Sequence, residues 1–60
     1  MIQVGDLVRL RHPFPDQGEQ LGLVIAIGPD DPLMPHHMRS VEVLISGKHW
    51  SFMMYALEKI

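Results

Sequence analysis

The chain has 60 residues, no cysteine and a formal net charge of -2, and 47% of its residues are hydrophobic. A chain of this size buries only about 60% of the surface that its unfolded form exposes, so residues 1–60 are expected to form one small domain. The lack of cysteine excludes disulfides and thiolate metal sites, and stability must therefore come from a dense apolar core.

The first predicted strand covers residues 4–11. Val8 and Leu10 alternate with Arg9 and Arg11 in this segment. An alternation of apolar and charged residues with a period of two is typical of a strand that has one buried and one solvated face. The segment is therefore expected to place two apolar side chains in the core and two arginines on the surface.

A loop, a second strand and a longer loop are expected next. Residues 12–20 contain two prolines and a glycine, which exclude a helix. The segment Leu21–Ile27 is rich in β-branched residues and apolar on both faces, which predicts a central strand, with Gly22 marking a bend or bulge. Residues 29–39 have no periodic pattern and predict a loop of unusual length for so small a domain.

The third and fourth strands are expected to form a hairpin. Val41, Val43 and Ile45 occupy every second position and are expected to face the core. Ser46-Gly47-Lys48 is typical of a tight hairpin turn. The return strand His49–Met53 places the aromatic rings of Trp50 and Phe52 on one face.

The end of the chain, Met54–Ile60, predicts one helical turn followed by a short strand, with Leu57 and Ile60 in the core. Five short, evenly spaced strands favour a closed architecture, because closure removes exposed sheet edges. The predicted fold is therefore all-β: a small five-stranded SH3-like barrel with one short helical turn near the C-terminus.

Four segments carry a resemblance to SH3-like small barrels: Gly5–Leu10, Gly22–Ile27, Val41–Gly47 and Leu57–Ile60. The chain is most similar to short phage-encoded SH3-like and KOW-like proteins of unassigned function. The resemblance implies a non-enzymatic interaction module, because families of this type mostly bind partners, commonly between loops. The expected partner is an unidentified protein, held by the loops at residues 12–20 and 29–39. The expected partner-binding residues are Phe14, Trp50, Tyr55, Met34 and Met38.

Self-association is a second expectation. Leu7, Leu23, Ile25 and Leu44 lie opposite the inward positions of their predicted strands, so apolar side chains should point outward. Because exposed apolar patches mark interfaces, the chain is expected to form a homo-oligomer.

The alternative to protein binding is a KOW-like contact with nucleic acid or a ribonucleoprotein through four basic residues. These are Arg9, Arg11, Arg39 and Lys48. Nucleic-acid binders normally have a clustered basic face, whereas this chain is slightly acidic with scattered basic residues. Nucleic acid is therefore a less favoured partner than protein.

Catalytic, metal and cofactor sites are not predicted. Imidazole is a common metal ligand, and the candidate ligands are His36, His37 and His49. Adjacent histidines in an extended segment point to opposite sides, however, and no His-x-His spacing occurs. No serine lies in a nucleophile elbow and no glycine-rich phosphate loop is present, so enzyme activity is not expected.

Membrane insertion and secretion are also not expected. The longest uninterrupted apolar run, Leu23–Ile27, is far shorter than the roughly 20 residues of a membrane span. The first residues lack the basic and apolar regions of a secretory signal. The sequence therefore predicts a cytoplasmic protein, located in the host cytoplasm if phage-encoded.

Overall fold

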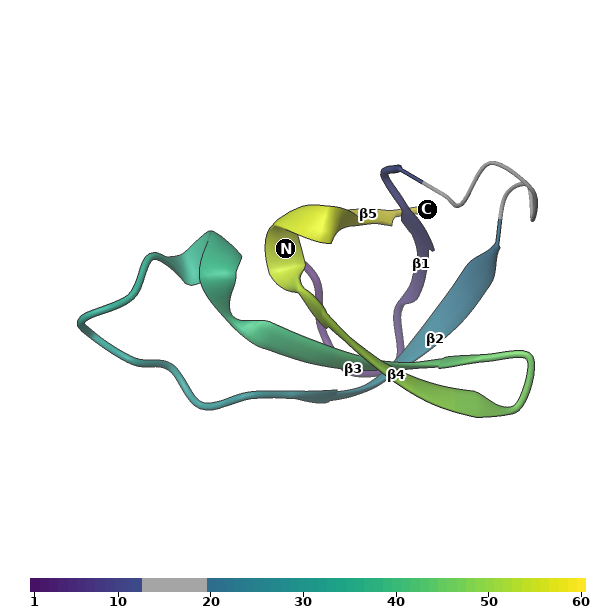
Figure 1. Ribbon diagram of the computed structural model, residues 1–60, viewed down its shortest axis with the longest axis horizontal. Helices are drawn as coiled ribbons and strands as arrows, with labels where there is room; N and C mark the ends of the chain where they lie inside the picture. Colours follow the sequence, from purple (N-terminus) through teal and green to yellow (C-terminus); the bar gives the residue numbers. More distant parts are fainter. Residues whose placement is uncertain (13–19) are drawn as a thin grey trace.

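The computed structural model describes residues 1–12 and 20–60, which form five antiparallel strands and two single-turn 3-10 helices (Figure 1). The predicted all-β fold, with five strands and a helical turn near the C-terminus, is confirmed. The elements in chain order are β1 (Leu7–Leu10), β2 (Leu21–Ile27), η1 (His36–Met38), β3 (Ser40–Ile45), β4 (Lys48–Met53), η2 (Met54–Ala56) and β5 (Leu57–Lys59).

The strands form one sheet in the order β4-β3-β2-β1-β5. Because β4 and β5 are its two ends, hydrogen bonding among the described residues does not close the sheet into the expected barrel. The turn η2 joins these end strands, and η1, in the β2–β3 connection, packs against η2. This arrangement is compatible with an SH3-like fold. Within residues 1–12 and 20–60, no helix is long and apolar enough to cross a membrane.

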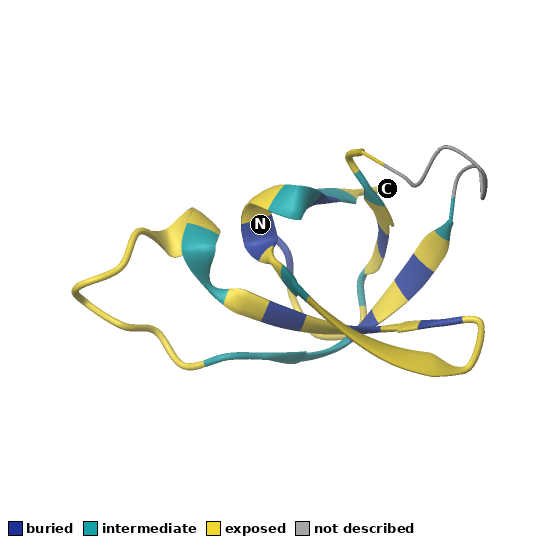
Figure 2. Ribbon diagram, viewed as in Figure 1, coloured by how far each residue is buried: buried dark blue, intermediate teal, exposed yellow. Residues whose placement is uncertain are grey.

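The strand β3 shows how the sequence pattern produces the core. Its inward residues Val41, Val43 and Ile45 are buried, whereas the three residues between them are exposed. The other buried residues pack with these side chains in one hydrophobic cluster. Figure 2 shows the buried positions along the curved sheet. Among residues 1–12 and 20–60, the buried apolar residues are Ile2, Val8, Val24, Val41, Val43, Ile45, Met54 and Leu57.

A two-residue turn joins β3 to β4. Ser46 has φ 51° and Gly47 has φ 78°, so both turn residues are in the left-handed region. Positive φ at both positions is the requirement of a type I′ hairpin turn, whose twist matches that of the flanking strands. The turn fixes the register from Ile45 opposite Lys48 onward, and the predicted hairpin is confirmed.

The irregularity predicted at Gly22 lies elsewhere in β2. Val24 and Ala26 pair with adjacent residues of β3, so Ile25 is an extra residue that forms a bulge. Gly22 is regularly paired and serves a different purpose: a Cβ atom there would lie 2.8 Å from Cγ1 of the buried Ile45. The glycine therefore permits a close approach of β2 to the core.

The prediction that Ile60 is buried was wrong. Leu57 is only 2% exposed, as expected, but Ile60 is 62% exposed. Residues three apart in an extended chain point to opposite sides, so an inward Leu57 directs Ile60 outward. In the C-terminal segment, the residues that pack in the core are therefore Met54 and Leu57.

Candidate functional site

Two aromatic rings lie on the core side of the edge strand β4. Phe52 pairs across the strands with the buried Val41, and Trp50 pairs with the buried Val43, so all four side chains share one face of the sheet. The two rings are stacked, with centroids 6.3 Å apart and an interplanar angle of 17°. Because no described strand lies outside β4, Trp50 remains exposed although it is on the core side.

The turn η2 extends this set of rings. Tyr55 and Phe52 both line an open pocket of about 290 Å³, together with Leu10, His12 and Ala56. On its other side, Tyr55 meets His37 of η1 edge to face, with ring centroids 6.2 Å apart. The residues His37, Tyr55, Phe52 and Trp50 thus form a continuous series, which we call the aromatic row.

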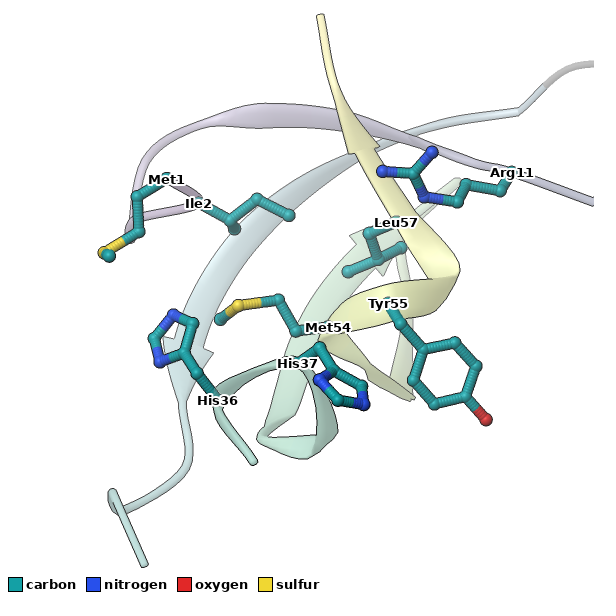
Figure 3. A pocket seen from close by; sticks show the side chains of 8 residues that line it. All are labelled: Met1, Ile2, Arg11, His36, His37, Met54, Tyr55 and Leu57. Atoms are coloured by element: carbon teal, nitrogen blue, oxygen red, sulfur yellow. The ribbon is translucent and has the colours of Figure 1, made fainter. Parts of the chain in front are cut away.

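Pockets lie at both ends of the aromatic row. At the Trp50 end, a hollow of about 190 Å³ is lined by Gln20, Ile45, Ser46 and Lys48 as well as Trp50. At the His37 end, a pocket of about 460 Å³ lies between η1, η2, the first two residues and the residue that follows β1 (Figure 3). We call it the Arg11 pocket. Its lining residues are Met1, Ile2, Arg11, His36, His37, Met54, Tyr55 and Leu57.

The structure brings together only part of the predicted partner-binding set. Trp50 and Tyr55 belong to the aromatic row, whereas Phe14 lies outside the described residues. Met34 and Met38 line a separate pocket of about 320 Å³ on the β2–β3 connection, which extends away from the sheet (Figure 1). The sequence did not predict Phe52 or His37 as site residues. The period-two spacing of Trp50 and Phe52 could have identified Phe52, because it places both rings on one face of the strand.

The four basic residues of the alternative hypothesis do not converge. Arg9 Nε donates a hydrogen bond to Glu58 Oε2 at 3.3 Å. Arg39 donates from Nη2 and Nε to the Gly28 carbonyl oxygen, at 2.7 and 3.3 Å. Arg39 precedes β3, while Lys48 begins β4 at the opposite end of the same hairpin. Nucleic-acid binding through these residues stays a prediction.

The pair of Arg9 and Glu58 makes stability dependent on pH. The hydrogen bond from Arg9, and then its charge, hold the pKa of Glu58 below the ordinary value of 4.5, and the charge of Arg11 adds a smaller effect. A lowered folded-state pKa means that the pair stabilises the fold above the ordinary value and that this contribution is lost as the pH falls through the folded-state pKa. The effect is expected to be small, as for most exposed ion pairs.

The pair can be tested with a Glu58→Gln variant. We expect the urea midpoint of the unmodified protein to exceed that of the variant near pH 7. The difference should shrink as the pH falls through the lowered folded-state pKa of Glu58. Because all other carboxyl groups are common to both proteins, the difference isolates Glu58. A difference that stays constant over this range would show that the ion pair does not contribute.

A row of leucines crosses the outer face of the sheet. Leu7 pairs with Leu23, and Leu23 pairs with Leu44, so the three lie side by side on β1, β2 and β3. All three are exposed, which confirms the expected outward orientation, whereas Ile25 at the bulge is partly buried. Self-association through this leucine row stays a prediction, and sedimentation at high micromolar concentration would test it.

The histidines considered as metal ligands are not brought together as a set. His36 and His37 belong to η1, whereas His49 pairs with Leu44 near the far end of the β3–β4 hairpin. Among residues 1–12 and 20–60, no three side chains of His, Asp or Glu gather as a metal site. His36 and His37 instead line the Arg11 pocket, where His37 packs against Tyr55.

The chain matches no protein-family model, and no curated protein or solved structure shows significant similarity to it.

Proposed function

We propose that the protein is a non-enzymatic interaction module that binds an extended segment of a partner protein along the aromatic row. The observation that carries this proposal is the continuity of the row. Its rings follow one another from η1 through η2 to β4, with a pocket at each end and a third between Tyr55 and Phe52.

The spacing of the rings suits an extended peptide. Neighbouring ring centroids are 6.2 Å apart at one end of the row and 6.3 Å apart at the other. Alternate side chains of an extended peptide lie about 6.6 Å apart on the same side of the chain. Alternate side chains of a bound segment could therefore contact successive rings. Aromatic residues supply much of the energy of protein interfaces.

The edge position of β4 adds a second source of affinity. No strand among the described residues pairs with its outer edge, and edge strands present backbone N–H and C=O groups to a partner. The strand order and the turn η2 also support the SH3-like resemblance, whose families mostly act as interaction modules. Membership of the phage-encoded type is part of the same proposal.

A selection experiment tests the proposal without knowledge of the natural partner. The purified protein is used to select binders from a displayed library of random peptides, with a Tyr55→Ala variant in a parallel selection. We expect peptides to be enriched by the unmodified protein and lost with the variant. Failure to enrich any peptide, or equal enrichment by both proteins, would contradict the proposal. Binding of an RNA or DNA oligonucleotide with an affinity that falls linearly with the logarithm of salt concentration would favour the nucleic-acid alternative instead.

A further inference from the structure

The Arg11 pocket combines an apolar floor with a basic rim. Ile2, Met54 and Leu57 are all buried and form the floor, as the close view shows (Figure 3). The guanidinium group of Arg11 extends over Leu57, and the imidazole rings of His36 and His37 lie on the side formed by η1 (Figure 3). None of the lining residues is acidic.

Arg11 differs from Arg9 and Arg39 in the contacts of its side chain with the described residues. Arg9 is bound by Glu58, and Arg39 is bound by the Gly28 carbonyl. Within the described part of the chain, the Arg11 guanidinium forms neither a hydrogen bond nor an ion pair. Its backbone is nevertheless fixed, since its N–H donates to the Ala56 carbonyl of η2 at 2.9 Å.

A cation at the rim of an apolar floor favours an anion that carries an apolar group. Arginine binds carboxylates with two parallel hydrogen bonds, and such charge-assisted bonds are stronger than neutral ones. The floor would bury an aliphatic side chain at the same time. A pocket of about 460 Å³ has room for both groups.

The Arg11 pocket is continuous with the aromatic row, because Tyr55 lines this pocket and also the pocket that it shares with Phe52. We propose that the Arg11 pocket receives an acidic residue and a neighbouring aliphatic residue of the partner segment, with the carboxylate bound by Arg11. This inference rests on the proposed function and adds a charge specificity to it. The aliphatic side chain lies on Ile2, Met54 and Leu57, while the rest of the segment continues past Tyr55.

A double-substitution experiment tests this specificity. The probe is a selected peptide, synthesised with acetylated and amidated ends so that its only carboxylates are side chains. Each acidic residue of the peptide is replaced by its amide, and each peptide is titrated against the unmodified protein and an Arg11→Gln variant. We expect one replacement to weaken binding to the unmodified protein about tenfold, the effect of losing a hydrogen bond to a charged group, and to change binding to the variant less than twofold.

The control variant is Lys59→Gln, which removes the same charge from β5 at a residue that lines none of the pockets along the aromatic row. It should keep the tenfold preference for the acidic peptide, because Lys59 lies outside the Arg11 pocket. Selected peptides without acidic residues, or equal sensitivity of the Arg11→Gln and unmodified proteins, would overturn the charge specificity while leaving the aromatic-row proposal intact. A selection that yields no binder would overturn both.

Discussion

Replacement of Leu57 by alanine is expected to lower the free energy of unfolding by about 2–5 kcal/mol, the usual effect of truncating a fully buried leucine. Leu57 is 2% exposed and packs in the single core cluster of the described residues. A chain of 60 residues has a total stability of only about 3–9 kcal/mol at typical values per residue. The variant should therefore be partly unfolded under mild conditions.

Ile60→Ala provides the matched control. Ile60 is also aliphatic and lies three residues further along the chain, but it is 62% exposed. Its truncation should change the free energy of unfolding by no more than about 0.5 kcal/mol, as at most exposed positions. Urea unfolding followed by circular dichroism measures both variants. Equal losses at the two positions would show that the C-terminal segment packs with Ile60 in the core.

Replacement of Tyr55 by alanine is expected to weaken binding of a selected peptide by about thirtyfold or more, which corresponds to the loss of an interface hot spot. Tyr55 is exposed, so the substitution should leave the fold intact, which a urea midpoint can verify. The Tyr55 ring lines both the Arg11 pocket and the pocket that it shares with Phe52, and it packs against His37. Its removal would therefore disrupt contacts on both sides at once.

Two further variants show whether the loss of peptide affinity in Tyr55→Ala comes from the missing ring and is specific to the aromatic row. Tyr55→Phe keeps the ring and should retain most of the affinity, since packing rather than the hydroxyl group carries the proposal. Met34→Ala changes a residue that the sequence also predicted to bind the partner but that the structure places in a different pocket. Isothermal titration should find unchanged affinity for Met34→Ala. A large loss for that variant would show that the site extends to the β2–β3 connection.

Local patterns were sufficient to predict the strands. The alternation in β3 and the turn residues Ser46 and Gly47 depend on neighbours in the sequence, and both predictions are confirmed. The bulge at Ile25 could not be placed in this way, because it depends on which residues of β3 lie opposite β2. The open sheet between β4 and β5 is likewise a property of the whole fold.

The candidate site was harder to predict from the sequence, because it too depends on contacts between segments that are distant in the chain. Trp50 and Tyr55 were identified by residue type, but their relation to His37 depends on the packing of η1 against η2. The Arg11 pocket combines residues from both ends of the chain and from the β2–β3 connection. The sequence suggested Arg11 only as part of the alternative nucleic-acid contact and assigned His36 and His37 to no site. Only the fold places these three residues around one apolar floor.

The most direct test of the central claim is a map of the binding surface. A selected peptide is titrated into isotopically labelled protein while the NMR signals of each residue are followed. Binding along the aromatic row predicts the largest shift changes at Tyr55, Phe52 and the Trp50 indole, with little change at Leu7, Leu23 and Leu44 on the outer face. Changes confined to those leucines would contradict the account and assign partner binding to the outer face of the sheet.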